Sequence, residues 1–152
     1  MAVSPNTDFS SGAILTAQQQ NNFPRGVMAY AKSTVDSTIT TSTADITAMT
    51  GTFTAVANRL YRATFECFFM VNSNSQNQFF ITDGSNAQQD QMFFDTVANL
   101  FAPLCFQYIF TTTAGSKTLK VRASTSAGTM TLYGATGANR SYSFVVEDLG
   151  PA

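Results

Sequence analysis

Hydrophobic and polar side chains alternate along much of this chain, and the stretch "NRLYRATFECFFMVN", residues 58–72, shows the pattern most clearly. One row of alternate positions is apolar throughout: Tyr61, Ala63, Phe65, Cys67, Phe69 and Val71. Such a row is typical of a β-strand with one buried face. The opposite row begins with polar residues but ends with Phe68 and Met70, so this strand carries large apolar side chains on both faces.

From Gly26 onward, short runs rich in β-branched and aromatic residues follow one another, separated by Gly, Asn, Asp and Ser. Their composition and flanking turn residues predict strands. The predicted strands are residues 27–35, 37–41, 50–57, 59–71, 78–82, 89–94, 104–113, 117–125, 129–135 and 142–149. Strands at a spacing of about ten residues predict an all-β fold, an antiparallel jelly-roll β-sandwich.

Residues 1–25 lack this alternation and are predicted to form an N-terminal arm, while residues 26–152 form the sandwich domain. The arm is polar and contains two prolines, with four scattered large apolar residues: Phe9, Ile14, Leu15 and Phe23. A disordered tail is the alternative interpretation. We favour an arm because spaced apolar side chains suit a segment that lies along neighbouring protein, and these four are the predicted anchoring residues.

Doubled aromatic residues indicate that the sandwich associates with other copies of itself. The predicted subunit contacts are Phe68 and Met70, one residue of the pair Phe79 and Phe80, and one residue of the pair Phe93 and Phe94. The register of each strand, which the sequence leaves open, decides between the members of each pair. Together these rings would expose more apolar surface than a monomer usually tolerates. The alternative is that the arm, or a long loop at residues 33–50, covers them within one chain. By analogy with other jelly rolls that have apolar outer sheets, we expect a homotrimer.

Composition narrows the function further. Only 11% of the 152 residues are charged, compared with about a quarter in ordinary globular domains. The net charge of −1 provides no field for nucleic acid, and no apolar run is long enough for a membrane span, so neither partner is expected. The N-terminal sequence does not resemble a signal peptide, which predicts synthesis in a cytoplasm.

The residue types needed for common catalytic sites are scarce. The chain has no His, which excludes Ser-His-Asp and Cys-His nucleophiles and His-ligated metals. Glu66 and Glu147 are candidates for a paired-carboxylate site, but ion pairs with Arg59, Arg62 or Arg122 explain such carboxylates more simply. The oxygen-rich run "DGSN" at 83–86 is interpreted as a β-turn rather than a calcium loop. We therefore predict no enzyme activity and no cofactor or metal site.

Cys67 and Cys105 lie in separate apolar runs. Two unpaired thiols are favoured over a disulfide, which the sequence leaves open. A cluster of amide side chains in predicted loops, including Asn72, Asn74 and Asn77, is compatible with carbohydrate binding but equally with ordinary soluble turns.

Several segments in order resemble a group of small virion proteins of tailed bacteriophages. They are "SGAILTAQQQNNFPRGVMAYA", "ITAMTGTFTAVANRLYRATFE", "FFITDGS" and the closing "FVVEDLGPA", and the similarity runs from Ser11 to Ala152. Members of this group serve as capsid decoration, head-fibre or minor tail proteins. The resemblance implies a jelly roll similar to tumour necrosis factor, usually trimeric.

The resemblance and the composition together predict a structural component of a tailed-phage virion. The first expectation is a trimeric capsid decoration (cement) protein, located on the capsid surface and bound to the major capsid protein through its arm. The alternative is a minor tail or fibre-tip protein that contacts tail proteins or binds a host surface glycan.

Overall fold

The computed structural model describes residue 14, residues 23–134 and residues 140–152. Their strands are β1 (Gly26–Ser33), β2 (Ser37–Ile39), β3 (Ala44–Ala55), β4 (Arg59–Val71), β5 (Ser75–Asp83), β6 (Gln88–Thr96), β7 (Phe101–Thr111), β8 (Gly115–Thr125), β9 (Met130–Leu132) and β10 (Tyr142–Pro151).

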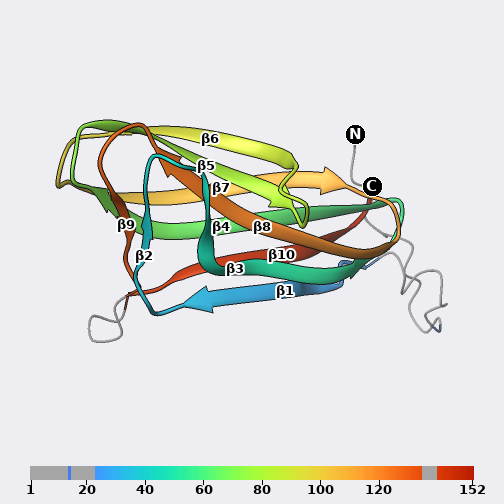
Figure 1. Ribbon diagram of the computed structural model, residues 1–152. Coiled ribbons are helices and arrows are strands. Elements are labelled where there is room, and N and C mark those ends of the chain that lie inside the picture. The colour runs from blue at the N-terminus through green and yellow to red at the C-terminus, as the bar shows by residue number, and fades with distance from the viewer. Residues whose placement is uncertain (1–13, 15–22, 135–139) are drawn as a thin grey trace.

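The strands form two antiparallel sheets that pack face to face (Figure 1). Sheet A has the order β1-β10-β4-β9-β2, with β7 paired to the other edge of β4, and sheet B has the order β3-β8-β5-β6. The long pairs are nested in the sequence: β5–β6 lies inside β4–β7, which lies inside β3–β8, which lies inside β1–β10. Such nesting is what results when a long hairpin curls into two sheets, and it confirms the predicted jelly roll.

The two ends of the sandwich differ. β1 begins and β10 ends at the same end, where Gly26 pairs with Asp148, and we call this the arm end (Figure 1). The opposite, distal end carries the loops at 72–74, 97–100 and 126–129.

The predicted inward row of β4 is confirmed. Every member from Tyr61 to Val71 is at most 5% exposed. Its rings meet those of sheet B across the core, with Phe69 and Phe79 in an edge-to-face arrangement at 5.1 Å between centroids. Alternation in β8 and β10 is also confirmed, because Val121, Phe144 and their inward neighbours are buried.

Residues 33–50 do not form the long loop considered as a cover for exposed rings. β2 and the first part of β3 lie there, and β3 begins six residues before its predicted start. The sequence hides this because the register of β3 against β8 shifts between Asp45 and Thr50. Ile46 and Met49 are both buried despite their odd spacing, and Ala48 between them has a φ of 64°. This bulge breaks the period of two that identifies a strand.

We expect Ala48→Gly to stabilise the protein by about 0.5–1 kcal/mol, because a positive φ is costly for Ala and free of strain for Gly. Urea unfolding measures the change. The control is Ala44→Gly in the same strand, where φ is not positive and the substitution should be destabilising by a similar amount. Equal destabilisation by both substitutions would show that the bulge is unstrained.

A buried ion pair closes the arm end. Arg59 Nε donates to Asp148 Oδ2 at 2.6 Å, and Arg59 Nη2 donates to Asp148 Oδ1 at 2.8 Å. The two side chains are 5% and 0% exposed. Three positions further along β4 and one position back along β10, Arg62 and Glu147 form a second pair at 2.8 Å, with 36% and 28% of their side chains exposed.

We expect Asp148→Ala to destabilise the fold by about 3–5 kcal/mol, because the Arg59 charge would stay buried without the carboxylate that neutralises it. Glu147→Ala, the matched control on the same strand, should cost about 1 kcal/mol or less, because water screens its pair. The midpoints of thermal or denaturant unfolding give both values. Similar losses for the two variants would contradict the inferred difference in burial.

Candidate interaction surface

The outer face of sheet A carries the exposed row of β4 that first indicated association. Across from it lie the outward residues of β7, so that Phe68 faces Pro103, Met70 faces Phe101 and Arg62 faces Ile109. The ion pair Arg62–Glu147 occupies the part of this face nearer the arm end. Apolar character therefore concentrates toward the distal end.

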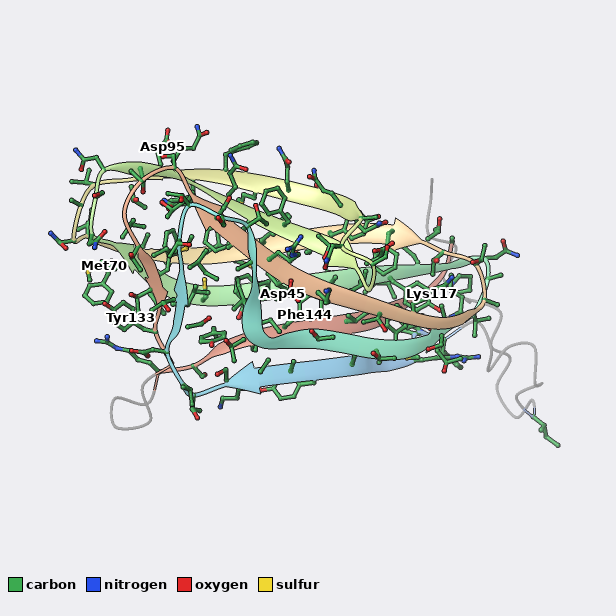
Figure 2. The ribbon with its side chains drawn as sticks, viewed as in Figure 1. Asp45, Met70, Asp95, Lys117, Tyr133 and Phe144 are labelled. Carbon is green, nitrogen blue, oxygen red and sulfur yellow. The ribbon has the colours of Figure 1, made fainter. Side chains whose placement is uncertain are left out.

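The apolar patch consists of five side chains at that end: Phe68, Met70, Phe101, Pro103 and Tyr133. Phe68 is 52% exposed and Phe101 49% exposed. The rings of Phe101 and Tyr133 lie 5.0 Å apart. The Tyr133 hydroxyl is 4.0 Å from the Met70 sulfur, and Figure 2 shows these two side chains close together at the end of the sandwich.

The Arg140 side chain borders the apolar patch. The Arg140 guanidinium lies 5.3 Å from the centroid of the Phe101 ring and 5.9 Å from that of Tyr133. Cation–π contact of this kind orders an exposed aromatic pair. The patch is thus a packed surface and not a set of independent side chains.

A shallow hollow of about 480 Å³ adjoins the patch, lined by Glu66, Phe68, Pro103, Cys105, Ser141 and Ser143 among others. Cys105 Sγ lies 3.7 Å from Glu66 Oε1. Partial desolvation and the Glu66 carboxylate raise the pKa of the Cys105 thiol. Cys105 is therefore a protonated, weakly nucleophilic side chain at neutral pH.

We expect the alkylation rate of Cys105 to reach half its maximum at a pH above that of an unstructured cysteine peptide, because the raised pKa keeps the thiol protonated. Glu66→Gln should shift the profile to lower pH by removing the repelling charge. Iodoacetamide labelling followed by mass spectrometry gives the profile. A profile identical to that of the peptide would contradict the inferred environment.

Cys67 and Cys105 are both free, as favoured from the sequence. The register of β4 against β7 explains why the two thiols do not pair. Cys67 lies opposite Leu104 and Cys105 lies opposite Glu66, so the two sulfurs are on opposite faces of sheet A. Burial strongly raises the pKa of the Cys67 thiol, which lies in the core.

Next to the outer face of sheet A lies one side of the sandwich, which we call the open side. β7 ends sheet A and β6 ends sheet B, whereas on the other side β1 packs against β3. Half-buried Tyr108 and Phe110 of β7 stack at 4.9 Å with an interplanar angle of 5°. A hollow opens beside them, and burial together with the Asp90 carboxylate raises the pKa of Tyr108.

Strand β7 is unusual for an unpaired edge. Its eleven residues, "FAPLCFQYIFT", contain no charged side chain. Edge strands of monomeric proteins usually carry charges, bulges or a covering segment that prevents pairing with other chains. Pro103 is one such protection, but Ile109 on its outward face is 55% exposed.

The structure separates the members of each predicted contact pair. Phe80 and Phe93 point outward, with Phe93 50% exposed, whereas Phe94 is half-buried and its ring lies 5.7 Å from that of Phe69. Phe79 is fully buried, which excludes it as a contact residue and leaves Phe80 as the outward member of that pair. The register of β5 puts Phe79 in the same inward row as Asn77 and Ile81.

The outward aromatic residues do not share one surface. Phe68 and Met70 lie on sheet A, and Phe80 and Phe93 lie on the outer face of sheet B. The residues predicted from the sequence as subunit contacts therefore lie on two different faces of the sandwich. Phe101 and Pro103 were missed because residues 101–103 lie before the predicted start of β7. Tyr133 lies within a predicted strand, but only the tertiary structure puts its ring beside Phe101.

Among the four predicted anchoring residues, Phe9 and Leu15 lie outside the described residues. Ile14 is 91% exposed and Phe23 is 39% exposed.

The loop residues considered for calcium or carbohydrate have structural contacts. Asp83 Oδ1 accepts hydrogen bonds from the Ser85 amide at 2.8 Å and the Ala87 amide at 2.9 Å, which confirms a turn between β5 and β6. Asn72 Oδ1 accepts from the Thr129 amide and Asn74 Oδ1 from the Ala98 amide, both at 2.8 Å. These amides tie loops of the distal end together.

Two carboxylates, Glu147 and Asp45, are likewise engaged in ion pairs. Glu147 accepts two hydrogen bonds from Arg62, and Asp45 pairs with both Lys120 and Arg122. Among the described residues, His, Cys, Asp and Glu side chains do not gather into a group of three that would suit a metal ion. A bilayer-spanning helix is likewise not found in the part of the chain that the structure describes.

Comparison with known proteins defines the fold class. Neither the family models nor the curated proteins give a match to the sequence. Among solved structures, that of Eiger TNF from S. frugiperda is similar, with a TM-score of 0.52 over 84% of this chain and 96% of that chain. At 11% identity, this likeness shows the fold alone. The chain therefore has the jelly-roll fold of tumour necrosis factor-like proteins, as expected.

Proposed function

We propose that this chain is a non-enzymatic structural protein of a tailed-phage virion, where homotrimers decorate the capsid and stabilise its shell. The resemblance of its segments to small virion proteins supports the setting. The surface described above supports the assembly.

The observation that carries the proposal is the junction between the apolar patch and the charge-free edge strand β7. Phe101 and Pro103 belong to both, so the exposed rings of sheet A continue into an edge strand that has no charged side chain, although Pro103 gives it some protection. A surface of this kind is stable in solution when another protein covers it. A second copy of the chain is the partner that is always present at matching concentration.

Self-association through this surface closes into a ring when the patch of one copy meets a different region of the next. The half-buried rings at the open side, Tyr108 and Phe110, supply a second apolar region, on the same strand as Phe101 and Pro103. A cyclic trimer satisfies both regions in every copy. Phe68 and Met70 would then lie in the subunit interface.

Attachment to the shell is assigned to the arm. The Phe23 carbonyl, the start of β1 and the end of β10 lie at one end of the sandwich, so a trimer would present the bases of its three arms on one side. Ile14 and Phe23 keep exposed apolar surface for contact with the major capsid protein. The alternative role in host-glycan binding receives less support, because Asn72 and Asn74 are engaged within the distal loops.

We expect Phe68→Ser combined with Met70→Ser to convert the trimer into monomers, because both changes remove apolar contact area from the interface. Light scattering coupled to size exclusion should give about three times the 16.4 kDa chain mass for the wild type and the single mass for the variant. Phe93→Ser, which is equally exposed on sheet B, is the matched control and should stay trimeric. A monomeric wild type would refute self-association.

Copy number per particle tests the location. Quantitative mass spectrometry of purified virions should find this chain in amounts comparable to the major capsid protein. A ratio of a few copies per particle would contradict the decoration role and favour a tail protein. Deletion of residues 1–22 should abolish binding to particles that lack the protein and leave the trimer intact.

A further inference from the structure

Arg59 is the most unusual side chain outside the apolar patch. It begins β4 and is only 4% exposed, although Arg is rarely buried in proteins. Its guanidinium makes the two-pronged contact with Asp148 of β10. Replacing such a pair by apolar residues is often neutral or stabilising, so the ion pair by itself does not explain why a charge is buried here.

A third contact distinguishes this guanidinium. Arg59 Nη2 also donates to the backbone carbonyl of Phe23, at 2.5 Å, just before the arm reaches β1. Asp148 Oδ1 in turn accepts from the amide of Gly150 at 2.8 Å. One planar group at the start of β4 thus contacts the base of the arm directly and, through Asp148, the irregular end of β10. Lys, with a single ammonium group, cannot reproduce this fork.

The neighbouring pair shows that this arrangement is specific. Arg62 and Glu147 belong to the same two strands, but their contact lies on the outer face and is about one-third exposed. Among the described residues, the side-chain hydrogen bonds of Arg62 go to Glu147. Arg62 is therefore a matched reference for the same residue type on the same strand.

We infer that Arg59 is a positioning residue that fixes the point and direction in which the arm leaves the sandwich. The carbonyl of Phe23 is held at the arm end by a donor that is itself held by Asp148. The ring of Phe23 is 39% exposed, so this backbone contact contributes to holding a segment that side-chain burial alone holds only in part. The structural role of Arg59 does not depend on the proposed function. Its consequence does: in a capsid-bound trimer, a fixed exit point lets the three arms contact the shell together.

Cleavage by trypsin at the Arg25–Gly26 bond reports on this contact. In the wild-type protein we expect the bond to be cut at least about tenfold more slowly than in a peptide spanning residues 20–30, because the adjoining chain is held at Phe23 and paired from Gly26. Equal rates would overturn the inference without any variant. Mass spectrometry identifies the product that begins at Gly26.

Arg59→Lys should raise the rate of this cleavage about tenfold, since a hydrogen bond from a charged donor is lost. Arg62→Lys is the control and should leave the rate unchanged. If Arg59→Lys does not fold, the double variant Arg59→Met with Asp148→Leu replaces the buried pair by apolar side chains and still removes the donor to Phe23. Unchanged cleavage in a folded variant at Arg59 would overturn the inference.

Binding of the same variants to particles separates this inference from the proposed function. Faster cleavage together with weaker particle binding supports both. Faster cleavage with unchanged binding supports the role of Arg59 and contradicts anchoring through the arm. Unchanged cleavage with lost binding contradicts the role of Arg59 alone.

Discussion

Strand β4 has partners along both edges, and this constraint organises the rest of the molecule. β10 and β9 share one edge, and β7 occupies the other. A strand held in this way has no freedom to rotate or slip, so each side chain is assigned to one face. The inward row builds the core with Phe79 of sheet B, and the outward row begins with the Arg62 ion pair and ends in the apolar patch. The core and the candidate surface are therefore two faces of the same strand.

The two sides of the sandwich are closed by different means, and this difference explains why the candidate surface lies where it does. On one side β1 packs against β3 and the chain covers its own core. On the other side β6 and β7 leave Tyr108 and Phe110 half-buried, next to an edge without charge. Because the chain covers its apolar side chains on only one of these sides, we propose that another copy of the chain covers the other side. The apolar patch borders the unsolved side, which is why both are assigned to one interface.

Three segments that are far apart in the sequence come together in space. Arg59 and Arg62, from "NRLYR", pair with Asp148 and Glu147, from "VEDLGP", and the carbonyl of Phe23 belongs to "NNFPRG". Gly150 in the last segment has a φ of 114°, a conformation that Gly adopts without strain. Three separated motifs thus form one structural unit at the arm end. Their co-occurrence in the sequence has a physical basis in the closure of the sandwich and the exit of the arm.

The strands, the jelly-roll class and the buried row of β4 could be predicted from the sequence, because the alternation of apolar side chains and the turn residues between strands are local properties of the chain. The sequence also favoured unpaired cysteines and a turn at Asp83, and both were found. It failed at Ile46 to Met49, where a bulge breaks the period. It left open which of Phe79 and Phe80 faces inward, because only pairing with β6 and β8 sets that register. Phe101 and Tyr133 are far apart in the sequence, and only the tertiary structure brings their rings beside Met70 to form the patch. Likewise, the sequence around Arg59 or Phe23 does not indicate that the two are in contact. Arg59 is held in place to bind the Phe23 carbonyl only once β10 has paired with β4 and brought Asp148 beside the guanidinium.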